Sequence, residues 1–242
     1  MDNEKKGYVV TYTARSYLEI KGNIILKSLG NLYIHRALLE SNNQKFKITF
    51  YTSLSDGDKA IEQTRLLVSK IERLINYKYN EQVLEQIHLF DSYYNDPDNL
   101  QVRSITTTQS RASPIIIKHI KDPLEIKEDL ETNLSNYYST YIDIYADLLK
   151  MNNGEGSFMM YYSLLYDLFG KQKSVDEYIV RQEPTVIMKK TTQPGSDFKE
   201  TIYSYIRNQI GHLNNEGDVK WIREQVSHYL PRLKQLTRRA IK

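Results

Sequence analysis

The chain has 242 residues, enough to bury a substantial core in one large domain or in two moderate ones. Its 33 Lys and Arg residues nearly balance 30 Asp and Glu residues, which excludes a polycation that coats nucleic acid indiscriminately, so any nucleic-acid site must be local. The absence of cysteine excludes disulfides, thiolate nucleophiles and cysteine-bound zinc, and no apolar run reaches the length of a membrane span. We therefore expect a cytoplasmic protein without a membrane anchor.

The first hundred residues predict strands and one long helix. Residues 7–13, 17–21 and 45–50 alternate apolar and polar side chains, the pattern of half-buried strands. From Asp58 to Tyr77 the apolar residues recur at helical spacing instead. The stretch NEQVLEQIHLF fits either type of element. After the turn signal DPDN, the stretches QVRSITTT and SPIIIKH are again predicted to be strands.

The second half of the chain is predicted to be helical. One long helical segment opens at Asp122 and Pro123 and runs to about Asn152, and SFMMYYSLLYDLFG is predicted to be a central buried helix stopped by Gly170. Ser174 and Glu177 have capping-box spacing for a short helix, and the segment 181–196 is predicted to be a loop. A final helix from Asp218 is interrupted or kinked at Pro231.

These patterns predict an α+β protein with two domains. A mixed α/β domain is expected over residues 1–115, and an all-α helical bundle over residues 120–242, with the boundary between 110 and 123.

One helix, ETIYSYIRNQIGHLNNEG, combines an apolar side with an unusual polar side. Capping-box spacing between Asp197 and Glu200 predicts where it begins. On a helical projection the apolar side is expected to face the core, and it comprises Phe198, Ile202, Ile206, Ile210 and Leu213. The opposite side comprises Glu200, Ser204, Arg207, Asn208, Gly211 and His212. Within a helix Gly211 costs about 1 kcal/mol relative to Ala, so we expect it to clear space beside Arg207 and His212 for a backbone or a phosphate.

The polar side suits phosphodiester cleavage. A guanidinium fork pairs with phosphate oxygens, and an imidazole can move a proton near neutral pH. On RNA, His212 would deprotonate the 2′-hydroxyl for in-line attack on the adjacent phosphorus while Arg207 stabilises the developing charge. This reaction needs no metal and spares DNA, which lacks the 2′-hydroxyl.

RNQIGH at residues 207–212 resembles the R-x4-6-H signature of HEPN domains (higher eukaryotes and prokaryotes nucleotide-binding), in the form with Asn directly after Arg. FMMYYSLLYDLFG upstream is similar to the hydrophobic helix that precedes the motif in bacterial members. The resemblance covers residues 120–242 and implies an all-helical unit. It implies nothing about residues 1–110.

Active HEPN proteins are metal-independent endoribonucleases, many of them toxins or antiphage defence effectors, and they usually pair two motif helices into one composite site. The resemblance therefore implies catalytic roles for Arg207 and His212, an orienting role for Asn208, a homodimer through the motif helices, RNA as substrate, an antitoxin or sensor as a further partner, and no cofactor. The alternative is a catalytically inactive HEPN-like module that binds RNA, nucleotides or a protein. An enzyme acting on small nucleotides ranks last, because no phosphate-cradling glycine loop is present.

Several other residues have two interpretations. Arg223 and His228 repeat the motif spacing, but Glu follows Arg and apolar residues surround the pair, so we interpret it as coincidence.

Near the C-terminus Arg232, Arg238 and Arg239 could bind RNA phosphates, although cations in a last helical turn are also ordinary dipole partners. Glu200 is interpreted as a helix-start acid rather than a catalytic one, Asp167 as a structural acid, and Tyr8, Tyr12 and Tyr17 as packing residues unless they are exposed for base stacking.

Overall fold

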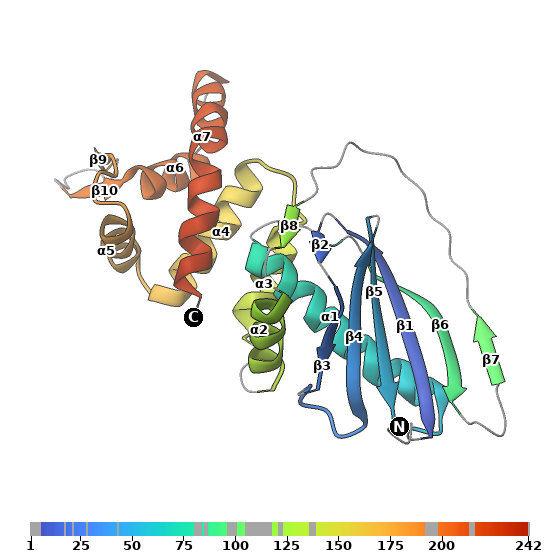
Figure 1. Cartoon of the computed structure of the whole chain (residues 1–242). Helices are drawn as coiled ribbons and strands as arrows, with labels where there is room; N and C mark the ends of the chain where they lie inside the picture. The colour runs from blue at the N-terminus through green and yellow to red at the C-terminus, as the bar shows by residue number, and fades with distance from the viewer. Residues whose placement is uncertain are drawn as a thin grey trace. The chain divides into compact units, whose positions relative to one another are not determined.

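A computed structural model describes the chain over residues 6–16, 18–20, 22–27, 29–42, 44–79, 84, 87–95, 101–104, 118–120, 123–135, 139–191, 198–212 and 216–241. It divides into two compact units, Met1–Thr140 and Tyr141–Lys242 (Figure 1). The predicted strand segments 105–117 lie outside the described residues. No helix within the described ranges combines the length and the apolar character needed to cross a membrane.

The first unit is built on a six-stranded antiparallel sheet. Its strand order is β3-β4-β5-β1-β6-β7, with strands β1 (Gly7–Arg15), β3 (Ile24–Leu26), β4 (Ile34–Asn42), β5 (Lys45–Thr52), β6 (His88–Asn95) and β7 (Gln101–Ser104). A separate parallel pair joins β2 (Leu18–Ile20) to β8 (Lys118–Ile120). Strands β1 and β5 of the sheet confirm the predictions at 7–13 and 45–50, β2 confirms the one at 17–21, and the ambiguous segment around His88 is strand β6.

Helix α1 (Gly57–Tyr79) covers one face of this sheet, as its helical periodicity predicted (Figure 1). Phe46, Ile48 and Phe50 of β5 are fully buried. The Tyr12 hydroxyl lies 2.9 Å from the Thr64 hydroxyl of α1. Tyr12 therefore serves packing and is not available for base stacking.

The long helix predicted from Asp122 to Asn152 is two helices, α2 (Pro123–Ser135) and α3 (Thr140–Leu148). Lys78 of α1 forms ion pairs with Glu125 and Asp129 of α2, so α2 belongs to the first unit. The units therefore divide between Thr140 and Tyr141, whereas the sequence pattern placed residues 120–242 together. The apolar residues keep one helical spacing across both segments, so periodicity alone cannot reveal that Ser139 lies outside both helices.

The second unit packs its helices around α4 (Glu155–Phe169), which contacts the other three major helices: α5 (Gln172–Gln182), α6 (Ile202–Gly211) and α7 (Glu216–Ala240). Phe158, Tyr161 and Leu165 of α4 are completely buried. Gly170 adopts the left-handed conformation (φ 77°) and its N–H caps the Tyr166 carbonyl, which confirms the predicted stop. Helix α7 continues through Pro231 instead of restarting there.

Two sequence predictions for this unit are wrong. The segment predicted as a loop contains strand β9 (Met188–Lys190), which pairs antiparallel with β10 (Lys199–Thr201), so the described part of the unit is not wholly helical. Strands of three residues are too short to show a period of two. Helix α5 begins after Lys171 without any side-chain cap, so the capping box at Ser174 and Glu177 is not formed.

Candidate active site

Helix α6 begins later than its sequence predicted. Thr201 is both the last residue of β10 and the N-cap of α6, where its hydroxyl accepts the Ser204 N–H at 3.4 Å. Glu200 lies in the strand, and pairing with β9 turns it inward, so that its side chain is 0% exposed. Phe198, predicted to be a core residue, is instead 42% exposed. The predicted helix start at the Asp197–Glu200 capping box is therefore wrong, and Asp197 itself lies outside the described residues.

A buried carboxylate on the neighbouring helix fixes this first turn of α6. Asp176 of α5 is only 5% exposed, and its Oδ1 atom accepts hydrogen bonds from the Thr201 N–H (3.1 Å), the Thr201 hydroxyl (2.6 Å) and the Ser204 hydroxyl (2.6 Å). The only proton of the Ser204 hydroxyl is used in that bond. The Tyr162 hydroxyl, 2.7 Å away on α4, must therefore donate to Ser204. Three donors from the junction of β10 and α6 thus meet at one carboxylate oxygen, and α4 joins the network through Ser204.

A second carboxylate holds the motif residues. Glu200 Oε2 accepts from Gln172 Nε2 at 2.6 Å and from Asn208 Nδ2 at 2.8 Å. The Asn208 carbonyl oxygen in turn accepts from Arg207 Nη1 at 2.9 Å. The Arg207 guanidinium carbon lies 5.9 Å from the centre of the Tyr162 ring, within reach of a cation–π contact. The chain Gln172–Glu200–Asn208–Arg207 thus positions a half-buried guanidinium.

Burial is the largest cause of the shifted pKa of both carboxyl groups, Asp176 and Glu200. It raises the pKa of Asp176, although the hydrogen bonds from Ser204 and Thr201 oppose the change. Burial also raises the pKa of Glu200, which the neighbouring Asp176 charge raises further, while the bonds from Gln172 and Asn208 lower it. The remaining oxygens, Asp176 Oδ2 and Glu200 Oε1, are buried and have no hydrogen-bond partner among the described residues. A proton on either of these oxygens leaves the bonded oxygen free to keep its donors.

The other end of α6 is open. Gly211 is the last helical residue, and His212 is the C-cap, whose backbone N–H bonds to the Gln209 carbonyl at 3.1 Å. Both residues are exposed, and a Cβ added to Gly211 would meet no atom within 4 Å. Gly211 therefore lies at the helix end and not in its middle as predicted, and nothing in the described part of the chain fills the space beside it.

The predicted RNA-binding arginines have mixed surroundings. Arg232 donates to Glu183 Oε2 (3.3 Å) and to Gln235 (3.0 Å), so its guanidinium is already engaged within the unit. Arg238 is half-buried, and Arg239 is exposed. The three arginines lie on α7, whereas Arg207 lies on α6.

The duplicate motif on α7 has none of the surroundings of the first. Arg223 bonds to Glu155 at 3.0 Å, and His228 packs edge-on against Tyr229. Neither residue contacts a buried carboxylate in the described structure. Asp167, interpreted as a hydrogen-bonded structural acid, is exposed but is hydrogen-bonded to the Tyr141 hydroxyl.

Sequence reasoning missed the acidic half of the site. Asp176 was not singled out, and Glu200 and Ser204 were placed on a solvent-facing polar side, whereas both are completely buried. A signal for Asp176 was present, because it lies on the same face of α5 as the buried residues Val175 and Ile179. An acid among apolar positions of an amphipathic helix indicates a buried, hydrogen-bonded carboxylate.

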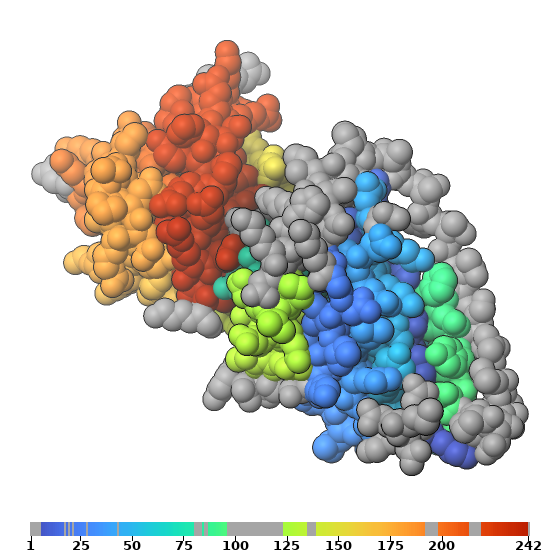
Figure 2. Space-filling model, viewed as in Figure 1, coloured from blue at the N-terminus to red at the C-terminus, as the bar shows by residue number. Residues whose placement is uncertain are grey.

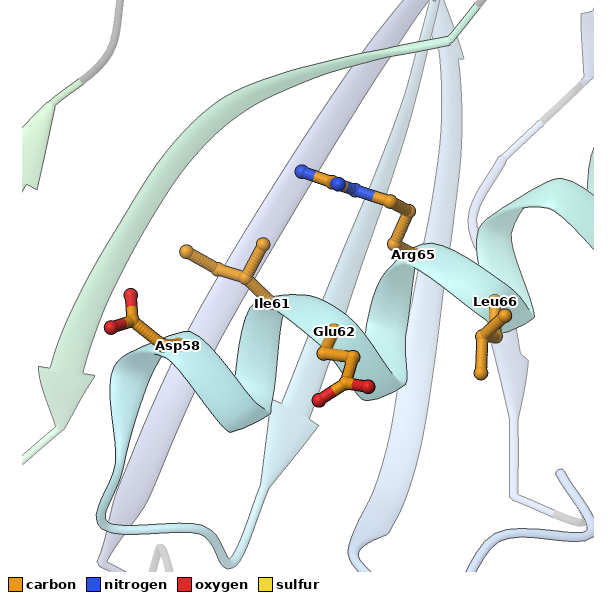
Figure 3. Close-up of a pocket in the computed structure, with 5 residues that line it drawn as sticks. All are labelled: Asp58, Ile61, Glu62, Arg65 and Leu66. Carbon is orange, nitrogen blue, oxygen red and sulfur yellow. The ribbon is translucent and has the colours of Figure 1, made fainter.

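A hollow in the first unit does not form a comparable site. It is lined by Asp58, Ile61, Glu62, Arg65 and Leu66, all from the first turns of α1. In Figure 3 these side chains point in different directions and do not converge on one point. Among the described residues of the whole chain, no group of three or more His, Asp or Glu side chains is arranged to hold a metal ion.

Comparisons of the chain with protein-family models, with curated proteins and with solved structures find no match.

Proposed function

We propose that the chain is a metal-independent endoribonuclease of the HEPN type, with Tyr141–Lys242 as its HEPN-like unit and with RNA as its substrate. The observation that carries the proposal is the hydrogen-bonded chain from buried Glu200 through Asn208 to Arg207. Burying a carboxyl group costs free energy, and here its hydrogen bonds fix the position of one guanidinium through an amide. It gives Asn208, the residue next to the motif arginine, a defined role.

The proposed reaction is transphosphorylation. His212 takes the proton of a ribose 2′-hydroxyl, and the 2′-oxygen attacks the adjacent phosphorus as the bond to the 5′-oxygen breaks. Arg207 stabilises the charge on the non-bridging phosphate oxygens. The protonated imidazole of His212 in a second copy donates a proton to the leaving 5′-oxygen. The products are a 2′,3′-cyclic phosphate and a 5′-hydroxyl.

Helix geometry supports a composite site made by two copies. Five residues of an α-helix separate Arg207 from His212, which corresponds to about 7.5 Å along the axis and about 140° around it. The Arg207 and His212 side chains of one chain therefore point in different directions and cannot easily contact the same phosphate. A second motif helix packed at the open end, beside Gly211, would supply the missing partner for each. We propose a homodimer through α6 for this reason.

The resemblance of the motif suggests the cellular role. We propose a cytoplasmic toxin or antiphage defence effector, whose activity an antitoxin or a sensor would restrain. The first unit, with its antiparallel sheet, is a separate compact body that such a partner could address.

The purified full chain should cut RNA in the presence of EDTA and leave 2′,3′-cyclic phosphate ends. Arg207→Ala should abolish the cleavage, whereas Arg223→Ala, the matched arginine of the duplicate motif, should leave it unchanged. An RNA preparation that stays intact with the wild-type protein would exclude the proposal.

The alternative is an inactive module that uses α6 as a dimer or partner interface. The exposed C-terminal end of α6 favours this as the second candidate. It predicts that Arg207→Ala changes the mass in solution, measured by sedimentation, while the wild-type protein never shows nuclease activity.

A further inference from the structure

The β9–β10 hairpin carries three exposed lysines directly beside the motif helix. Lys189 and Lys190 lie on β9 and Lys199 on β10. The hairpin is continuous with α6, because β10 ends at the N-cap Thr201 and the Ile202 N–H bonds to the Ile187 carbonyl at 2.8 Å. In Figure 1 the hairpin lies at the start of α6. It is therefore fixed to the same helix that carries Arg207.

The pairing of the hairpin places like charges opposite each other. Lys190 is directly opposite Lys199 in the antiparallel register. Such a pair repels, whereas opposite charges at the same position would stabilise the strands. The only described acid of the two strands, Glu200, is buried and does not offset the surface charge. The described surface of the two strands therefore carries three lysines and no acid, which favours an anionic ligand.

Side-chain alternation brings one lysine to the proposed site. Directly opposed residues of an antiparallel pair project to the same face, and Lys189 is opposite Glu200. Glu200 binds Asn208, the neighbour of Arg207. Lys189 therefore lies on the hairpin face that leads to the Arg207 guanidinium, and Lys190 and Lys199 lie on the other face.

The surface of the hairpin and α5 extends this charge. Between residues 171 and 201, the described cations at the surface are Lys171, Lys173, Arg181, Lys189, Lys190 and Lys199, and the described surface acids are Glu177 and Glu183. Glu183 is already paired with Arg232. Phe198, next to Lys199, is an exposed aromatic ring on which a base can stack.

We infer that the β9–β10 hairpin binds the phosphate backbone of single-stranded RNA next to the bond that Arg207 and His212 cleave. The inference rests on the proposed function for its ligand. Lysine side chains contact phosphates without reading sequence, so the hairpin supplies affinity and fixes the direction of the strand.

The test measures binding separately from cleavage. A His212→Ala protein, which cannot process the RNA, is titrated with a fluorescent single-stranded RNA of about 20 nucleotides at several salt concentrations. The variant Lys189→Gln/Lys190→Gln/Lys199→Gln is compared with the control Lys59→Gln/Lys150→Gln/Lys220→Gln, which removes three exposed lysines elsewhere. We expect the hairpin variant to bind about tenfold more weakly, with a salt slope smaller by at least about 0.7, the contribution of one single-strand phosphate contact, because Lys189 lies on the opposite face from Lys190 and Lys199.

Two results would overturn the inference. An unchanged salt slope in the hairpin variant would show that the lysines do not contact RNA and that an acidic protein surface is the better candidate ligand. An equal loss in the control variant would show that binding follows net charge alone. If the wild-type protein binds RNA through the hairpin yet never cleaves it, the proposed nuclease fails while the hairpin inference stands.

Discussion

The two ends of α6 are built in opposite ways. At the first turn, Thr201 and Ser204 are completely buried and bonded to Asp176. At the last turn, Gly211 and His212 are exposed, and the His212 N–H bonds to the Gln209 carbonyl. One end is fixed by a network whose loss would leave buried donors unsatisfied, and the other is free to meet something outside the chain. The comparison teaches that residues of one motif can depend on the fold to very different degrees.

Replacing His212 should produce the largest effect on activity and almost none on stability. We expect His212→Ala to slow RNA cleavage by about 100-fold to 10,000-fold, the usual contribution of a general acid–base group. Its free energy of unfolding should stay within about 0.5 kcal/mol of wild type, because the side chain is exposed at a helix end. Single-turnover cleavage and urea unfolding measure the two quantities. His228→Ala, from the duplicate motif, is the control and should cleave normally.

Replacing Asp176 should produce the largest effect on stability. Asp176→Ala leaves the Thr201 N–H and two hydroxyl groups without their acceptor, which should cost about 3 kcal/mol in the free energy of unfolding. Urea unfolding followed by circular dichroism measures the loss. Glu177→Ala, the exposed neighbour on α5, should change stability by less than about 0.5 kcal/mol. Equal stability of the two variants would contradict the role of the Asp176 network.

The buried carboxyls should make stability depend on pH in an unusual direction. The pKa values of Asp176 and Glu200 are raised in the folded chain, so the folded state holds these protons more tightly than the unfolded state. Their contribution is fully present below the usual carboxyl range and is lost as pH rises through the raised pKa values. Asp176→Asn/Glu200→Gln should flatten the dependence of the free energy of unfolding on pH above the usual carboxyl range of about pH 4. Urea midpoints across this range measure it, and a wild-type profile as flat as that of the variant would disprove the assignment.

Gly211 should give the smallest effect on the isolated chain. Because a Cβ there meets open space, Gly211→Ala should fold normally and gain up to about 1 kcal/mol in stability. If a second copy packs against this helix end, the same change should weaken dimerisation, and cleavage should fall with it. Sedimentation and cleavage assays test the pair of outcomes. Gly156→Ala on α4, where an added Cβ also meets no atom within 4 Å, should change neither dimerisation nor cleavage.

Much of the fold could be predicted because its signals are local. The long helix α1, strands β1 and β5, and the stop of α4 at Gly170 follow from periodicity and from one glycine conformation, which the chain displays over a few turns. The hairpin could not be predicted this way. Its two strands have three residues each, so neither strand shows a pattern of its own, and their pairing joins segments separated by eight residues of chain.

The residues of the candidate site also differ in whether a local sequence pattern reveals them. Arg207, Asn208 and His212 stand out in the sequence because the spacing of an arginine and a histidine is visible in one helix. Asp176 and Glu200 did not, since one lies on another helix and the other on a strand. Whether an acid is a surface residue or a buried hydrogen-bond acceptor depends on what packs over it.

By itself, the sequence determined the chemical groups available: a guanidinium, an amide and an imidazole on one helix, and no thiol anywhere in the chain. Tertiary structure decided which polar groups are buried, that Glu200 orients Arg207 through Asn208, and that His212 is left exposed. The physical reason is that side-chain identity is a local property, whereas desolvation and hydrogen-bond partners arise only when distant segments pack together.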